Sequence, residues 1–161
     1  MIYQGELLAI RISANAGEEM ESRSNMEAIE GEGLREDRYA NCKGAFQKGK
    51  ITRSQQVTLI EEEAIQSACA DYELDVEHAT TRRNLLTSGV PLNHLVGVEF
   101  CVGDVRLRGV KLCEPCGYLD RLTGKKMVEA FRHRGGLRAE VISGGMLRVG
   151  DPIVPVSDEP G

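Results

Sequence analysis

The sequence predicts a mainly β fold, a barrel or a sandwich with a few peripheral helices, on two observations. Short strand-like runs recur along the chain, at 5–13, 56–60, 98–113 and 137–156, whereas only two or three short segments have helical composition. Glycine accounts for 18 of the 161 residues, aromatic residues are only 4% and tryptophan is absent. This composition indicates many turns around an aliphatic core. A doubly wound α/β sheet would need more helices.

The first third of the chain predicts one strand and two polar connections. Residues 5–13 alternate apolar and polar side chains in part, which favours a first strand, and the polar stretch 14–25 then predicts a loop. Residues 31–55 are rich in glycine and charge without a helical period. They predict a long loop that is either functional or mobile.

The middle of the chain predicts a strand followed by an amphipathic helix. Residues 56–60 have strand composition, and the following segment, 61–74, contains helix formers. Helical spacing places four small or apolar residues on one face of this segment, namely Ala64, Ile65, Ala68 and Cys69. The carboxylates of residues 61–63 would lie in the first turn, where the helix dipole favours negative charge.

The last third of the chain predicts paired strands around short helices. Residues 98–113 contain two strand-like runs with a hairpin signal at Gly103-Asp104. Residues 123–134 have the composition of a short helix, and 137–156 contain two more strand-like runs separated by Gly144-Gly145. We expect one domain over residues 1–156 and a disordered tail at 157–161.

Charge and hydropathy exclude several classes of protein. Twenty Lys and Arg against 25 Asp and Glu give a formal net charge of −5, which argues against a nucleic-acid partner, although a local basic patch is compatible with it. No apolar run is long enough to span a membrane, and the first residues lack a basic region. The five cysteines are odd in number and scattered, which favours reduced thiols and a cytoplasmic protein.

Cys113 and Cys116 form the most distinctive chemical motif, CEPC. A structural zinc site needs four ligands, and the three histidines form no cluster with this pair. A redox dithiol is compatible with the spacing, but the βαβ context of such motifs is missing. If a helix starts at Cys116, unpaired backbone N–H groups would favour its thiolate. The alternative, that both cysteines are small core residues, is equally compatible with the spacing.

Two arginine-containing segments are candidate anion sites. Arg82, Arg83 and Asn84 present adjacent donors, and a guanidinium matches phosphate in a bidentate manner. The alternative is a strand whose arginines lie on a solvated face. Arg38 follows Asp37 in a glycine-containing loop, where it can bind an anion or pair with neighbouring carboxylates.

Taken together, these segments resemble the MOSC domain, the C-terminal domain of molybdenum-cofactor sulfurases. The resemblance extends over residues 3–154 and rests on the order and spacing of five segments: GLREDRYA, RSQQVTLIEEEAI, TRRNLLTSGVPLNHLVGVEFCVGDVRL, LCEPCGYLDRL and RGGLRAEVISGGMLRVGDPI. It implies a mixed β-barrel similar to the β-barrel domain of pyruvate kinase. One departure is Glu36, which stands where the family pattern GLxGDR has glycine. A carboxylate there would oppose an anionic phosphate unless the side chain turns outward.

The resemblance also implies a ligand and a chemistry. The domain would bind the pyranopterin molybdenum cofactor, with Cys116 as the metal ligand or persulfide carrier and Cys113 as a structural residue. Arg82, Arg83, Asn84 and Arg38 would bind the cofactor's phosphate. Pyridoxal phosphate, associated with some members of the family, is not expected in this chain, because the desulfurase domain that uses it is missing.

Three functions are compatible with this resemblance. The leading hypothesis is a molybdenum-cofactor protein that carries or transfers sulfur through Cys116, supplied by a cysteine desulfurase and serving a molybdoenzyme. The second is a molybdenum-dependent reductase of N-hydroxylated compounds, which would need electron-transfer proteins. The third is a non-catalytic carrier of the cofactor.

Overall fold

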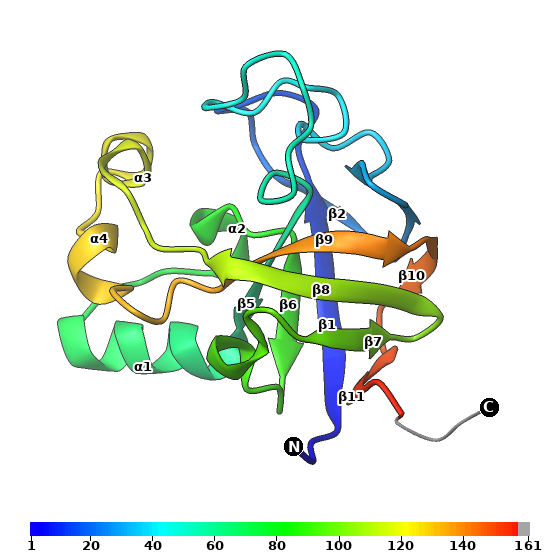
Figure 1. The fold of residues 1–161 in the computed structure, drawn as a ribbon. Coiled ribbons are helices and arrows are strands. Elements are labelled where there is room, and N and C mark those ends of the chain that lie inside the picture. The colour runs from blue at the N-terminus through cyan, green and yellow to red at the C-terminus, as the bar shows by residue number, and fades with distance from the viewer. Residues whose placement is uncertain (158–161) are drawn as a thin grey trace.

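A closed, mixed β-barrel forms the body of the protein in the computed structural model, which describes residues 1–157 (Figure 1). Neighbouring strands pair in the order β11-β7-β8-β9-β5-β6-β1, and a further pairing of β11 with β1 closes the ring. The seven strands are β1 (Gly5–Ile12), β5 (Val57–Glu61), β6 (Leu85–Ser88), β7 (Glu99–Val102), β8 (Val105–Leu112), β9 (Leu137–Ser143) and β11 (Pro152–Pro155). The predicted mainly β fold is therefore confirmed.

The parallel pair β5–β6 explains the position of the first two helices. All other neighbours in the barrel are antiparallel, whereas β5 and β6 run in the same direction and need a crossover connection. That connection contains α1 (Glu62–Tyr72) and α2 (His78–Thr81). The predicted amphipathic helix is confirmed, since α1 buries Ala64, Ile65 and Ala68. The one-turn helix α2 has no counterpart in the sequence prediction.

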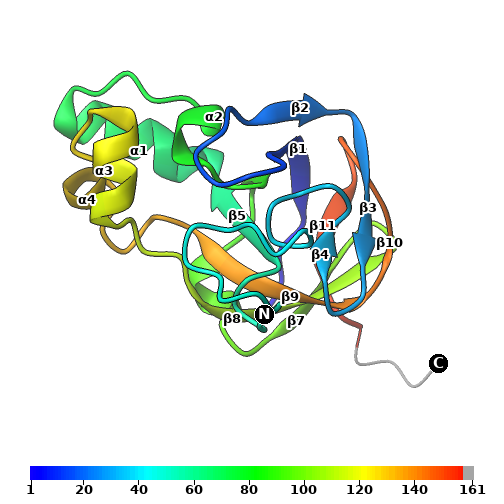
Figure 2. The same cartoon turned by 90° about the horizontal axis from the view of Figure 1, so that it is seen from above.

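A smaller sheet covers part of the barrel. Its strand order is β10-β3-β4, from Gly145–Arg148, Asn25–Ile29 and Gly33–Leu34, and β2 (Glu21–Arg23) extends the main sheet beside β1. The polar connections predicted at 14–25 and 31–55 therefore contain β2 and β4, and β3 lies mostly between them, in residues without a predicted element. From Arg35 to Gln56 the chain forms turns and bends, as predicted for a long loop. Figure 2 shows this loop running over the barrel.

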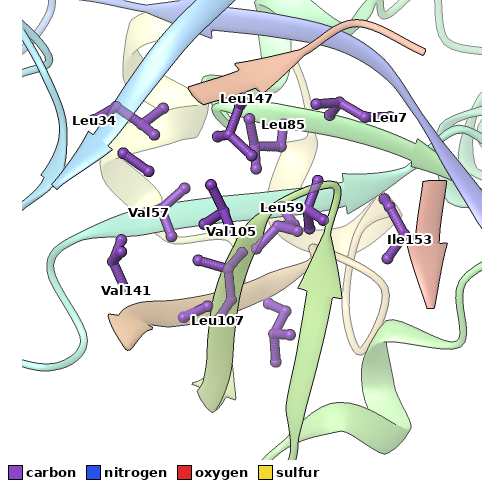
Figure 3. Packing of buried hydrophobic residues seen from close by; sticks show 14 of the residues in the cluster. Leu7, Leu34, Val57, Leu59, Leu85, Val105, Leu107, Val141, Leu147 and Ile153 are labelled. Atoms are coloured by element: carbon purple, nitrogen blue, oxygen red, sulfur yellow. The ribbon is translucent and has the colours of Figure 1, made fainter. Parts of the chain in front are cut away.

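The apolar residues form two clusters, one inside the barrel and one outside it. The inner cluster includes Leu59, Leu85, Leu107 and Leu147, whose side chains converge in Figure 3. The outer cluster packs residues such as Ile60 on the barrel against α1, α3 (Gly117–Thr123) and α4 (Met127–Ala130). Successive strand residues point to opposite faces, so β5 supplies both clusters.

The remaining connections also match the predicted pattern of turns. The hairpin between β7 and β8 turns at Gly103-Asp104, as predicted. A 3₁₀ helix, Leu92–Leu95, precedes β7, and no helix in residues 1–157 is long and apolar enough to cross a membrane. Apart from Ser157, the predicted tail lies outside the described residues.

Candidate functional site

A cavity of about 290 Å³ lies between α3, the end of β8 and the long loop. Its wall includes Arg38, Arg82, Arg83 and Cys116, which come from three widely separated segments of the sequence. The fold thus brings together four of the five residues predicted for the site. Asn84 does not line the cavity.

The two cysteines of the CEPC motif have different environments. Cys113 is 1% exposed, and its backbone N–H donates to the Gly136 carbonyl at 2.7 Å. Cys116 is exposed, and it is the N-cap residue of α3, as expected from the sequence. Its carbonyl accepts a hydrogen bond from the Leu119 N–H at 2.9 Å, which fixes the start of the helix. Only the Cys116 thiol is presented to a ligand.

Arg82 and Arg83 lie in the turn between α2 and β6, so the strand interpretation of this segment is wrong. Arg82 has φ 60°, in the left-handed region, and caps the C-terminus of α2. Its Nη1 donates to the Glu18 carbonyl at 2.5 Å, whereas its Nη2 is buried and has no partner among the described residues. Burial lowers the pKa of Arg82, and the nearby Arg38 guanidinium lowers it further. A buried donor without a partner stabilises a bound anion.

The Arg83 guanidinium is buried and donates hydrogen bonds to three backbone carbonyls. Its Nε donates to the Gly135 carbonyl at 2.8 Å, its Nη1 to the Thr81 carbonyl at 3.2 Å and its Nη2 to the Cys113 carbonyl at 3.0 Å. The side chain therefore connects the α2–β6 turn to the CEPC segment and to the start of β9. These bonds position the site, while Arg82 retains the unpartnered donor.

Asn84 is fully buried, and its side chain connects the strands β1 and β5 to the long loop. Its Oδ1 accepts from the Thr58 N–H at 3.0 Å, and its Nδ2 donates to the Arg11 carbonyl at 3.1 Å and to Asp37 at 3.2 Å. Asn84 thus organises the barrel beneath the cavity. A direct contact with a ligand would require these bonds to break.

Arg38 lines the cavity, but most of its donors are engaged. Its Nη1 bonds to Asp37 at 3.1 Å, its Nη2 donates to the Arg82 carbonyl at 3.0 Å, and its guanidinium lies 4.5 Å from the centre of the Tyr39 ring. Burial raises the pKa of Asp37, while the Arg38 guanidinium and the Ser13 N–H oppose that rise. Arg38 therefore orients the backbone that carries Arg82.

Glu36 has a backbone conformation that explains the glycine of the family pattern. Its φ is 68°, a region that glycine occupies without steric cost. The side chain is exposed and does not line the cavity, so the carboxylate turns away from the positively charged wall. The departure from the pattern adds backbone strain without adding negative charge to the cavity.

The sequence analysis missed two cationic residues of the wall, Lys111 and Arg138. They are directly opposite each other on the antiparallel strands β8 and β9, and opposite residues point to the same face. Arg138 donates to the Ser54 carbonyl at 3.1 Å. Burial lowers the pKa of Arg138, but the electrostatic influence of Cys113, Tyr39 and Cys116 and a hydrogen bond with the Tyr39 side chain outweigh burial and raise it. The observation that would have identified both residues is the register of β8 and β9, and this register is known only from the structure.

Three aromatic residues also line the cavity. Tyr39 and Phe46 come from the long loop, and Tyr118 comes from α3. The rings of Phe46 and Tyr118 meet edge to face, with centroids 5.7 Å apart. These rings supply flat apolar surface beside the cationic groups.

Comparison with known proteins identifies the family. The MOSC domain matches residues 44–154, which include Arg82, Arg83, Asn84 and Cys116. The chain belongs to the MOSC domain family. No curated protein matches the chain in sequence.

Solved structures share the MOSC fold of this chain at low sequence identity. The YuaD protein from Bacillus subtilis superposes with a TM-score of 0.81 at 15% identity, covering 98% of this chain and 99% of that one. YiiM from Geobacillus stearothermophilus gives a TM-score of 0.70 at 11% identity, with 98% and 77% covered. YiiM from Escherichia coli gives 0.64 at 18%, with 100% and 72% covered. These similarities show the fold.

The MOSC family is associated with the molybdenum cofactor, and the cavity has suitable chemistry for that group. Cys116 offers a soft thiol ligand, Arg82 a buried donor without a partner, and the three rings apolar faces. Within residues 1–157 no three His, Cys, Asp or Glu side chains are grouped to hold a metal ion. Cys116 is the thiol that the described part of the cavity wall would offer to the metal of such a cofactor.

Proposed function

We propose that this protein binds the molybdenum cofactor, or a precursor of it, in the cavity beside α3 and carries sulfur on Cys116. The main supporting observation is the exposed thiol of Cys116 on a wall that also holds Arg82, Lys111 and Arg138. Bound there, the cofactor would supply a molybdenum centre that accepts thiolate or sulfide. A cysteine desulfurase would supply the sulfur, and a molybdoenzyme would receive the product.

The side chains in and beneath the cavity have different roles in this proposal. Arg82 and Arg138 donate to the cofactor's phosphate, since guanidinium groups match phosphate geometry. Tyr39, Phe46 and Tyr118 provide surfaces on which a flat pterin can pack. Arg38, Arg83 and Asn84 hold the surrounding backbone through the hydrogen bonds described above.

The test is native mass spectrometry, with molybdenum analysis, of protein produced in a host that makes the cofactor. We expect bound pterin and molybdenum, or one added sulfur atom on Cys116, in the wild-type protein. Cys116→Ser should lose the metal ligand or the sulfur, whereas Cys113→Ser should retain it, because the Cys113 thiol is buried. Absence of pterin and molybdenum from the wild-type protein would refute cofactor binding, and absence of added sulfur as well would refute the whole proposal. Turnover of an N-hydroxylated base with an electron donor would favour the reductase instead.

A further inference from the structure

The cavity concentrates positive charge that the chain as a whole lacks. The formal net charge of the protein is −5, yet the described residues of the cavity wall include five cationic side chains and one carboxylate, that of Glu114. This carboxylate accepts the His133 N–H at 3.0 and 3.1 Å, so it is already engaged. Such an excess of positive charge raises the local concentration of small anions.

Three of the five cationic side chains have N–H donors without a partner among the described residues. Within residues 1–157 the Lys111 ammonium forms no hydrogen bond or ion pair, and the buried Nη2 of Arg82 has no partner. Arg138 donates to the Ser54 carbonyl and bonds to the Tyr39 side chain, which leaves part of its five-donor guanidinium available. These three side chains line the same cavity, where each can donate to a small oxyanion.

The thiol beside this anion site has no neighbouring thiol on the cavity wall. Among the described residues, Cys116 is the one cysteine that lines the cavity, and Cys113 is buried. A persulfide formed on Cys116 is therefore protected from attack by a second thiol, which would convert it to a disulfide. The cavity favours storage of sulfur over dithiol redox chemistry.

We propose that an inorganic dianion with a sulfane sulfur, of the thiosulfate class, loads Cys116 directly. This inference rests on the proposed sulfur-carrier role of Cys116 and names a small-molecule donor for it. The Cys116 thiolate attacks the sulfane sulfur, a bond forms between Sγ and that sulfur, and the sulfur–sulfur bond of thiosulfate breaks. Sulfite leaves with the electron pair, so the step needs no oxidant or reductant.

The cations make this reaction possible at the site. A thiolate and a dianion repel each other, and the positive charges of Lys111, Arg138 and Arg82 offset that repulsion. The same groups hydrogen-bond to the sulfonate oxygens and stabilise the charge that moves onto the leaving sulfite. A cavity of about 290 Å³ has room for such an ion.

The experiment uses the purified full chain with sodium thiosulfate. We expect one added sulfur atom on the Cys116 peptide by mass spectrometry, release of sulfite, and formation of thiocyanate when cyanide is added as acceptor. Lys111→Gln and Arg138→Gln should each lower kcat/KM for thiosulfate by about tenfold, the loss expected for one hydrogen bond to a charged group. Lys50→Gln, which changes an exposed lysine outside the cavity wall, is the matched control and should leave the rate unchanged.

A second measurement separates anion binding from thiol reactivity. Alkylation of Cys116 by neutral iodoacetamide reports the thiol alone, so the ratio of the thiosulfate rate to the iodoacetamide rate should fall about tenfold in Lys111→Gln. This variant should fold normally, because the Lys111 side chain is exposed and makes no bond within residues 1–157. Inorganic sulfate should compete with thiosulfate in the wild-type protein and less in the variant.

Two results would overturn the inference. The first is a Cys116 that reacts with iodoacetamide but gains no sulfur from thiosulfate, and the second is a thiosulfate rate that is the same in the wild-type protein, Lys111→Gln and Arg138→Gln. Cofactor binding is measured separately, by pterin and molybdenum content. A protein that holds cofactor but ignores thiosulfate refutes only this inference, whereas one that reacts with thiosulfate without holding cofactor refutes only the cofactor proposal.

Discussion

Replacement of Arg83 by glutamine should destabilise the fold, although this residue lines the cavity. The wild-type guanidinium donates to the carbonyls of Gly135, Thr81 and Cys113, and the residue as a whole is 9% exposed. A hydrogen bond to a charged group contributes about 1.5–3 kcal/mol, and the glutamine amide can replace one of the three at most. Because neighbouring bonds are not additive, we expect a loss of about 3 kcal/mol, a large part of the roughly 5–15 kcal/mol of a typical domain.

Urea unfolding and thermal melting measure this loss, with Arg82→Gln as the matched control. For a chain of this size 1 kcal/mol corresponds to about 2–4 °C, so Arg83→Gln should lower Tm by roughly 6–12 °C. Arg82 gives up a single exposed bond, to the Glu18 carbonyl, and its replacement also removes a buried donor that has no partner among the described residues. Arg82→Gln should therefore lower Tm by less than Arg83→Gln while weakening anion binding. Full stability of Arg83→Gln together with lost binding would show that its guanidinium serves the ligand, and would refute the argument.

Three further predictions concern the backbone and buried ionisable groups. Glu36→Gly should stabilise the protein by about 1 kcal/mol in thermal melts, because it relieves a positive φ, whereas Glu32→Gly, at an exposed turn position without positive φ, should not. Burial and, to a smaller extent, the Glu63 carboxylate raise the pKa of Glu61 to about 7. The protonated Glu61 side chain therefore stabilises the fold below pH 4.5, and this stabilisation is lost as pH rises through 7. Glu61→Gln does not ionise, so it should gain stability relative to the wild-type protein between pH 5 and 8. Burial and, to a smaller extent, the Arg11 guanidinium lower the pKa of His78 to about 4. The neutral imidazole therefore stabilises the fold above pH 6.5, and the free energy of unfolding should fall by about 3 kcal/mol as pH drops to 4. In urea titrations, His78→Gln should show a weaker dependence of stability on pH over this range.

The sequence was informative about the barrel because its strands have local signatures. The hairpin at Gly103-Asp104 and the helix after β5 follow from turn chemistry and from apolar spacing, which neighbouring residues determine. The strands β2, β3 and β4 have at most five residues, too few to show a period, and β3 also pairs with β10, which is distant in sequence. The pairing of β3 with β10 therefore cannot be read from neighbouring residues.

The same distinction applies to the candidate site. Cys116 was predictable because a turn, a proline and a helix start lie together in one short segment. Lys111 and Arg138 were not, because they become neighbours only through the register of β8 and β9. Asn84 follows two arginines in sequence, but its side chain turns inward to Thr58, a direction that the order of residues does not reveal.

The motif residues that support the family resemblance mostly hold the site together. Arg38 donates to the Arg82 carbonyl, and Arg83 donates to the Cys113 carbonyl. Asn84 donates to the carboxylate of Asp37, the neighbour of Arg38. These bonds bring the unpartnered donor of Arg82 and the thiol of Cys116 to one cavity from segments that are distant in sequence. Groups with free donors, such as Lys111, can then be exchanged without loss of the fold. Substitutions of exposed residues on the cavity wall can therefore change ligand preference in this fold while the buried hydrogen bonds stay the same.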